Sequence, residues 1–421
     1  LGMGGATKYS IHQSRGDPGG ASRMFTGMLL LSVLFSIPFL LLGLFCSHGI
    51  TVLLGADQAV FEMTRTYLQV LLLFAPATLV NDVLLCFVRN DGDPRLSMLA
   101  TAAGSLANIV LDYIFIFPMG MGIFGAVLAT GMSPVLGILI LLPHCIRKKG
   151  DLRLVPCPLS PGPTASALSL GLPSLLAQLS SAVVMIAFNS IILGLEGNTG
   201  VAAYGVIMYA AFLFVAVFVG YAVGSAPIVS FHYGARNHAE VHNLYQKSLR
   251  LIAVVAVTLT LASMFIIPCV ARVFVGYDAE LLALTSRAFR LYALSFLIMG
   301  FNVYASSFFT ALGDGVTSAL ISFLRTLVFQ VIAILLLPML LGIDGIWLAV
   351  TAAELAALAG GKICDVTRTS VTVEFCDTTE RVENFLSLCR PYGLKSVVRT
   401  GSVAMEKGGG SLSAENSGAK S

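Results

Sequence analysis

Long apolar stretches, interrupted by short polar segments, make up most of this chain. A helix needs about 20 apolar residues to span the hydrocarbon of a bilayer, whereas barrel strands would be shorter and would alternate strictly. Residues 1–11 have the pattern of the end of one such helix, whose beginning is absent. Ten complete membrane-spanning helices are predicted at residues 24–46, 67–88, 96–117, 121–146, 168–195, 201–233, 251–275, 291–312, 316–341 and 345–360.

The second half of the chain repeats the first. One repeat period holds six helices, and this even number means that both halves insert in the same direction, as a parallel repeat. We therefore expect an all-α polytopic membrane protein with two helical lobes, an N-lobe at residues 1–150 and a C-lobe at residues 151–360. At an offset of 220 positions (224 − 4), Gly4, Gly5, Ala6, Ser10 and His12 align with Gly224, Ser225, Ala226, Ser230 and His232.

The pattern changes after residue 360. Residues 371–375 alternate apolar and polar side chains, which is the period of a half-exposed strand. Residues 377–389 have a helix-start signal and one apolar stripe, and residues 394–398 have the pattern of a second strand. We expect a short α+β, ferredoxin-like fragment at residues 361–407 and a Gly/Ser-rich disordered tail at 408–421.

Composition supports a membrane protein and argues against several other classes. Apolar residues make up 57% of the chain, charged residues 11%, and the mean hydropathy is +0.88, whereas soluble domains have about 25% charged residues. The net charge of +3 comes without a basic stripe, so we expect no nucleic-acid partner. The cysteines lack metal-site spacing, and no nucleotide-binding loop or nucleophile motif is found. We expect no catalytic residues, no metal and no cofactor, so an ion gradient would have to drive transport.

Basic residues in the short loops predict the orientation in the membrane. If the helices alternate in direction, most Lys and Arg residues fall on one side, which is then cytoplasmic. Arg65, Arg272, Arg287 and Arg290 fall on the opposite side. The residues on the predicted cytoplasmic side are Arg15, Arg23, Arg89, Arg95, Arg147, Lys148, Lys149, Arg153, Arg236, Lys247 and Arg250.

Asn108 and Asp112 are the main candidates for binding chemistry. They are four residues apart and share one face of a predicted helix, and an ionisable group at membrane depth is a functional candidate by default. Thr130, on the next helix, could add a hydroxyl. These oxygens could hold Na⁺, or Asp112 could take up H⁺ instead. The alternative is that Asn108 and Asp112 only hydrogen-bond a bent helix end near Pro118.

Arg325 and Glu354 form a second candidate pair. Both lie inside predicted spans, on the last two helices, and opposite charges in a membrane interior usually pair. We favour a structural ion pair in the C-lobe over a role in transport.

Several motifs, in order along the chain, resemble the multidrug and toxic compound extrusion (MATE) transporters. They include Leu1–Thr7, Arg89–Pro94, Asn108–Phe117, Tyr233–Arg236 and Gly342–Trp347. The likeness covers most of residues 1–357 and points to the branch of staphylococcal-type drug exporters. It implies twelve helices in two six-helix lobes, of which the first helix and part of the second are missing here. It also implies a multi-pass protein of the plasma membrane, which we expect to be a monomer.

The resemblance also implies roles for individual residues. In MATE proteins, positions matching Asn108, Asp112 and Thr130 join an Asp of the first helix to form a cation site in the N-lobe. Gln178 and Asn302 stand where the sodium-type branch carries acidic residues, so a second cation site in the C-lobe is not expected.

Residues 361–407 resemble the C-terminal end of the regulatory (small) subunit of acetolactate synthase. The motifs are Lys362–Arg368, Ser370–Glu374 and Arg390–Ala404. The amino-acid-binding N-terminal domain of that family is absent, so we do not expect valine sensing.

The leading hypothesis is an antiporter, coupled to H⁺ or Na⁺, that exports amphipathic or cationic small molecules by alternating access. Because the first-helix partner of Asp112 is missing, we expect weak transport or an inactive chain. One alternative is a flippase for lipid-linked precursors in the same superfamily. Others are an acetolactate synthase regulatory fragment, involved in branched-chain amino acid biosynthesis, and a non-functional gene fusion.

Overall fold

A computed structural model describes residues 1–54, 58, 60–146, 152–156, 161–359, 362–366 and 371–374. The chain forms two compact units, Leu1–Ala359 and Gly360–Ser421. The second unit contains an antiparallel pair of strands, β1 (Lys362–Val366) and β2 (Val371–Glu374). Strand β2 matches the strand expected at 371–375 over the residues that the structure describes there. The helix expected at 377–389, the strand at 394–398 and the tail at 408–421 lie outside the described residues.

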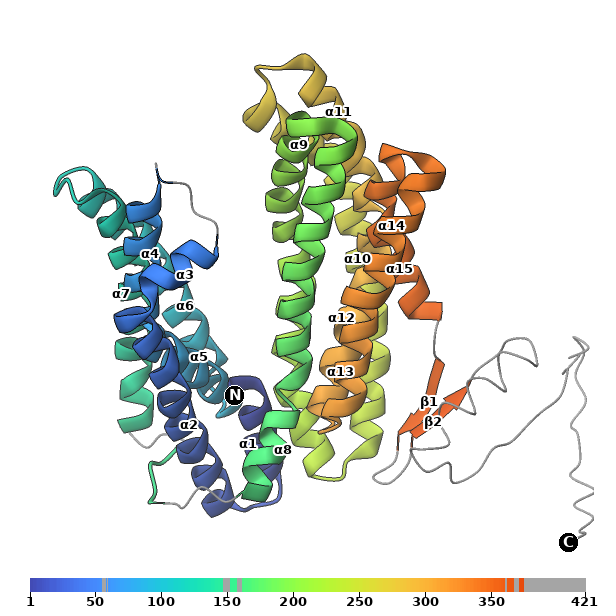
Figure 1. Ribbon diagram of the computed structural model, residues 1–421. Coiled ribbons are helices and arrows are strands. Elements are labelled where there is room, and N and C mark those ends of the chain that lie inside the picture. The colour runs from blue at the N-terminus through green and yellow to red at the C-terminus, as the bar shows by residue number, and fades with distance from the viewer. Residues whose placement is uncertain are drawn as a thin grey trace, which may run out of the picture. The chain divides into compact units, whose positions relative to one another are not determined.

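The first unit is all-helical, as predicted (Figure 1). The N-lobe contains α1 (Gly2–Ser14), α2 (Pro18–Phe45), α3 (Ser47–Leu53), α4 (Phe61–Leu73), α5 (Ala75–Asn90), α6 (Pro94–Ile116) and α7 (Gly122–Ile146). Helix α8 (Pro161–Ser169) leads into the C-lobe. The C-lobe contains α9 (Leu172–Gly234), α10 (His238–Val275), α11 (Ala279–Ala293), α12 (Phe296–Ala311), α13 (Gly315–Phe323), the π-helix η1 (Leu324–Phe329), α14 (Gln330–Leu341) and α15 (Ile343–Ala359).

These helices account for the ten predicted spans. Six helices in the described part of the chain are long and apolar enough to cross a membrane, or up to eight when each of two bent pairs counts as one span. Helix α9 contains two of the predicted spans, because the backbone at Gly197 (φ 61°, ψ −151°) breaks it. Helix α15, of 17 residues, supplies the last. The sequence did not predict the bends of 48° that separate α4 from α5 and α11 from α12.

The backbone repeats along with the sequence. Gly16 has φ +69° and its counterpart Arg236 has φ +59°, while Gly92 has φ +91° and its counterpart Gly313 has φ +84°. Each of these turns is followed by a helix whose first turn is capped by a side-chain oxygen, which satisfies a free backbone N–H. The capping pairs are Asp17 with Asn237, which accept from Gly20 N and Glu240 N, and Asp93 with Asp314, which accept from Leu96 N and Thr317 N.

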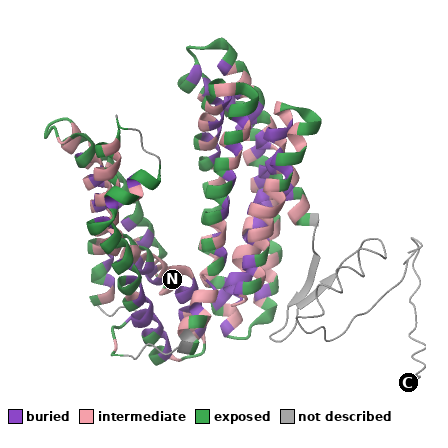
Figure 2. Ribbon diagram, in the orientation of Figure 1, coloured by how far each residue is buried: buried purple, intermediate pink, exposed green. Residues whose placement is uncertain are grey.

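Each lobe has its own apolar core. Buried side chains from Ala6 to Ala167 form the N-lobe core, and those from Val184 to Ala353 form the C-lobe core. Leu152 and Ala167, beyond the predicted lobe boundary at residue 150, pack in the N-lobe core. Exposed apolar side chains run along the helices (Figure 2), as on α2, where Leu34 is 54% exposed. Such extended apolar surface is rare on soluble monomers, so it fits a surface facing lipid.

The two lobes touch at one end of the helices. We call it the basic end, because Arg15, Arg89, Arg95 and Arg236 lie in or beside its loops. There α1 packs against the end of α9, at the lower side of the view in Figure 1. A Cβ on Gly234 would lie 2.0 Å from Ser14 Oγ and 3.0 Å from Ile11 Cα. Because only a glycine fits this close approach, α1 is an N-lobe element that closes the basic end.

Candidate functional site

Two close contacts set how α6 and α7 face each other. A Cβ on Gly104 of α6 would lie 3.0 Å from Ser133 Oγ of α7, and one on Gly125 of α7 would lie 2.8 Å from Phe115 Cβ of α6. The helices are antiparallel, and residues four apart share a face. Asn108, one turn after Gly104, therefore lies level with Thr130, and the next turn of α6 lies level with residues 125–128.

Asn108 and Asp112 each have a buried polar atom that makes no hydrogen bond to any described residue. The atoms are Asn108 Nδ2 and Asp112 Oδ1, and both side chains are half-buried. Thr130 Oγ1 donates to Ala126 O at 3.1 Å. The alternative, that Asn108 and Asp112 serve only to hydrogen-bond a helix end, gains no support from these two atoms. We call the region of Asn108, Asp112 and Thr130 the α6–α7 seam. A buried polar atom without a partner costs about 1–3 kcal/mol, so a ligand that bound these atoms would stabilise the N-lobe.

Asn81 is a polar residue of this region that the sequence analysis missed. Its Oδ1 is buried and has no partner among the described residues. A Cβ on Gly137 of α7 would lie 2.3 Å from that oxygen, so the Asn81 side chain occupies the space that a larger residue at position 137 would need. Gly137 is one turn beyond Ser133 on the same face of α7. The signal that could have revealed Asn81 is an amide next to Asp82 within a mostly apolar span.

The C-lobe brings Arg325 and Glu354 together. Arg325 Nη1 donates to Glu354 Oε1 at 3.1 Å, and Asn302 Nδ2 donates to Glu354 Oε2 at 2.7 Å and to Glu354 O at 2.9 Å. The Arg325 and Glu354 side chains are 16% and 6% exposed. The carboxylate is thus buried with two hydrogen-bonding partners. Asn302 stands where the sodium-type branch of the MATE family is expected to carry an acidic residue. Here its amide contacts a carboxylate that α15 supplies.

Unpartnered polar atoms lie on the two elements that supply this ion pair. Arg325 lies in the π-helix η1, a rare element that is frequent at functional sites. Its Nε is buried without a partner among the described residues, as are Trp347 Nε1 and Thr351 Oγ1 on the face of α15 that carries Glu354. The sequence predicted the charged pair but not the polar stripe beside it.

A shallow apolar groove runs along the second half of α9. It consists of two adjoining hollows of about 310 Å³ each, which share Gly220. At 100° per residue, Ala216, Gly220 and Val223 lie within about 40° of Gly234 around the helix axis. The groove therefore continues the face that α9 turns toward α1. Its lining residues are Phe212, Val215, Ala216, Val219, Gly220, Tyr221, Val223, Gly224, Ser225, Ile228, Val229, Leu244 and Ser248.

The two lobes, their repeated turns and the α9 groove can be compared with known proteins. The model of the MatE family matches residues 1–114 and 173–336, which is more than half of the chain. The chain belongs to the MatE family. The expected resemblance to MATE transporters is thereby confirmed, and with it the fold class and a multi-pass location in the plasma membrane.

Individual relatives agree with this family membership. The multidrug export protein MepA of Staphylococcus saprophyticus is 24% identical over 360 residues, which are 84% of this chain and 77% of MepA. A multidrug resistance MATE family transporter solved in its outward-facing conformation is 27% identical, with a TM-score of 0.79 over 85% of this chain and 80% of the other. A MATE structure in complex with MaL6 gives a TM-score of 0.81 at 26% identity, over 86% and 82% of the two chains.

A second family model matches the end of the chain. It describes the small subunit of acetolactate synthase and covers residues 350–408, from the last turns of α15 onward. The expected resemblance of residues 361–407 is therefore confirmed.

Proposed function

We propose that this chain exports amphipathic or cationic small molecules in exchange for H⁺ or Na⁺, by alternating access of its two lobes. Its family membership and its likeness to multidrug export protein MepA support export of drug-like compounds. The separate cores of the two lobes support movement of each lobe as one body, because each core holds its own helices together. The observation that carries the proposal is the pair of unpartnered atoms on Asn108 and Asp112.

The α9 groove suits an apolar or amphipathic substrate. Its lining includes valines, a phenylalanine and glycines, with hydroxyls from Tyr221, Ser225 and Ser248. Broad, mostly apolar surfaces with few fixed polar groups accept varied ligands. None of the described lining residues is charged, whereas a flippase for an anionic lipid-linked precursor would need cationic groups. The groove thus favours drug export over that alternative.

The α6–α7 seam suits a small cation. Asp112 supplies a carboxylate, Thr130 a hydroxyl and Asn108 an amide, which presents its oxygen after a 180° turn. Hard oxygen donors of this kind suit Na⁺, and a proton on Asp112 would neutralise the same charge. Either event removes a negative charge from the interior of the N-lobe and so changes the relative stability of two lobe arrangements.

Replacing Asp112 tests the coupling. In Asp112→Asn the amide keeps the shape of the side chain but cannot exchange a charge, so we expect efflux of a cationic dye from energised cells to fall to the level of cells without the transporter. Glu196→Gln is the matched control, because it removes one carboxylate charge from an exposed position of α9 and should leave efflux unchanged. Efflux by wild type and Asp112→Asn that is equal at equal expression, and above the level of cells without the transporter, would show that Asp112 has no coupling role.

The match of residues 350–408 to the acetolactate synthase small subunit favours a second, separate function for the second unit. We propose that this unit can bind a catalytic subunit of acetolactate synthase. Titration of the detergent-solubilised chain with that subunit should give saturable binding that a chain stopped after Gly360 lacks. Identical behaviour of the two chains would refute this proposal and leave the transport proposal unaffected.

A further inference from the structure

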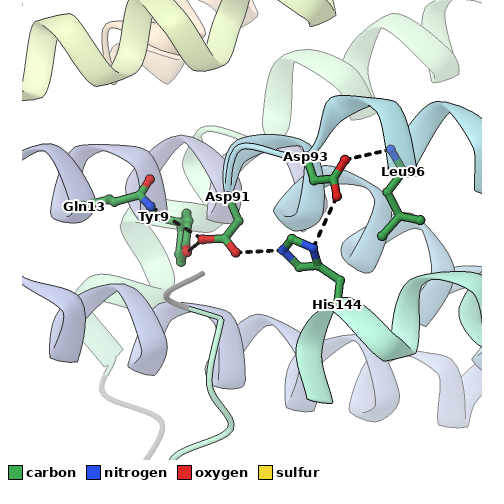
Figure 3. Close-up of polar contacts among 6 residues, drawn as sticks. All are labelled: Tyr9, Gln13, Asp91, Asp93, Leu96 and His144. Atoms are coloured by element: carbon green, nitrogen blue, oxygen red, sulfur yellow. Dashed lines mark hydrogen bonds and ion pairs between the residues drawn. The ribbon is translucent and has the colours of Figure 1, made fainter. Parts of the chain in front are cut away.

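A buried cluster of charged and polar residues lies at the basic end of the N-lobe (Figure 3). Asp91, in the turn between α5 and α6, accepts hydrogen bonds on Oδ1 from the hydroxyl of Tyr9 and, at 3.5 Å, from Gln13 Nε2. Its Oδ2 lies 2.9 Å from Nε2 of His144, near the end of α7. His144 Nδ1 lies 3.6 Å from Oδ2 of Asp93. One carboxylate, Asp91, thus connects α7 to α1.

The geometry indicates the charge state of His144. Its two ring nitrogens face two different carboxylates, and the side chain is 5% exposed, while the Asp91 side chain is fully buried. A protonated imidazole carries an N–H at both nitrogens, whereas a neutral ring would turn a lone pair toward one carboxylate. The arrangement therefore fits the imidazolium. Loss of its proton would remove the positive charge that both carboxylates face and leave a ring lone pair pointing at one of them.

The fold itself does not require these charges, as the internal repeat shows. The C-lobe builds the same turn, with Gly313 and the capping Asp314 in place of Gly92 and Asp93. At the offset of that turn, 221 positions, Asp91 corresponds to the buried Leu312. The C-lobe thus forms this corner with an apolar side chain. A buried carboxylate that the architecture can replace with leucine points to a function beyond packing.

The cluster holds the helix that closes the basic end. Tyr9 and Gln13 bind Asp91 from α1, while Ile11 and Ser14, on the same helix, pack against Gly234 of α9. A change in the Asp91 contacts therefore acts directly on an element that joins the lobes.

We propose that His144 and Asp91 form a proton-binding site whose occupied state holds α1 against α9 and keeps the basic end closed. When His144 releases its proton to water, Asp91 loses its imidazolium partner, the position of α1 loosens and the lobes separate at this end. By linkage, the closed arrangement binds the proton more tightly than the open one. This inference rests on the proposed transport function, to which it adds a proton site distinct from Asp112, but its test reads lobe positions rather than efflux.

Other charged groups surround the site. Asp93 and Arg89 come from the α5–α6 region, and Arg147, Lys148 and Lys149, which follow α7 in the sequence, lie outside the described residues. The same end also carries a second histidine–carboxylate pair, His12 with Asp17 at 2.9 Å, whose side chains are 34% and 46% exposed. This exposed pair provides a matched control.

The test measures the distance between the lobes as a function of pH. Spin labels at Leu53 and Tyr277, which are 85% and 84% exposed, are introduced into a full-length chain whose eight native cysteines are replaced. Double electron–electron resonance then reports the populations of lobe arrangements in nanodiscs. From pH 5 to pH 8 we expect the ratio of closed to open basic end to fall about tenfold, in the usual range of coupling between two sites.

Variants assign the response to the cluster. His144→Gln should remove most of the pH dependence, and His12→Gln should retain it. Asp91→Asn keeps an acceptor for Tyr9 but removes the buried charge, so it should also flatten the response, and it decides the matter if His144→Gln fails to fold. A wild-type distance that does not change with pH, or a response that survives Asp91→Asn, would overturn the proposal. If the protein shows the predicted pH response but cells that contain it export no more dye than cells without it, only the transport proposal is contradicted.

Discussion

The contact between Gly234 and α1 gives the sharpest mechanical prediction. In Gly234→Ala the new methyl group would lie 2.0 Å from Ser14 Oγ, 3.0 Å from Ile11 Cα and 3.2 Å from Ile11 O. Ser14 can turn away, but it then loses its hydrogen bond to Ile11 O, worth about 1 kcal/mol. The Ile11 backbone must move as well, and overpacking of this kind typically costs about 1–3 kcal/mol. We expect the closed basic end to lose about 2 kcal/mol, which shifts its population relative to the open arrangement by roughly 30-fold.

The lobe-distance measurement described above checks this prediction. Gly205→Ala is the matched control, because it lies on the same helix and a Cβ there has no neighbour within 4 Å. Both substitutions replace a glycine of α9 with alanine, and neither the interior position Gly205 nor the last residue Gly234 has a left-handed backbone. A change in the lobe distances that only Gly234→Ala produces therefore reports the contact with α1. If Gly234→Ala and Gly205→Ala gave the same distribution of distances, α1 and α9 would not form the closing contact.

Three further predictions concern stability and the appended unit. Arg325→Ala should destabilise the C-lobe by about 3 kcal/mol, because it leaves the buried Glu354 carboxylate without its cationic partner. Arg287→Ala breaks an ion pair whose arginine is 68% exposed, so it should cost less than about 1 kcal/mol. Thermal unfolding in detergent checks this order. Arg236→Gly should raise the unfolding temperature, because it removes about 1 kcal/mol of strain from a residue with a left-handed backbone. Gly16→Ala, at the repeat-related position, should lower the unfolding temperature for the same reason. Shifts of the same sign in both variants would show that the two turns are not equivalent. A chain stopped after Gly360 should retain dye efflux, because the following residues form a separate unit; loss of efflux at normal membrane expression would show that this unit takes part in transport.

The spans of the fold were predictable from the sequence, but their bends were not. Apolar length alone located the helices, and the sequence repeat extends to the backbone, as the similar φ angles of Gly92 and Gly313, 221 positions apart, show. The break between α4 and α5 has a local signal, since Pro76 lies in the first turn of α5. The equal bend between α11 and α12 occurs at Leu294 and Ser295 without a proline, so tertiary packing must maintain it.

Of the candidate sites, likewise, one could be predicted from the sequence and another could not. The spacing of Asn108 and Asp112 on one helix placed them together, because local periodicity determines which residues share a face. Asp91 and His144 are 53 residues apart, and only the packing of α7 beside the α5–α6 turn brings them to 2.9 Å. A sequence pattern that contains one aspartate in a turn and one histidine at a helix end does not reveal such a pair.

The most direct test of the transport account is movement of substrate by the purified full-length chain in proteoliposomes. A cationic dye is supplied on one side, and either a proton gradient or a sodium gradient is imposed in the opposite direction. We expect that one of the two gradients drives dye accumulation, that collapsing this gradient stops it, and that Asp112→Asn abolishes it while Glu196→Gln does not. Dye accumulation that is equal in wild type and Asp112→Asn, or that persists without any gradient, would contradict the account.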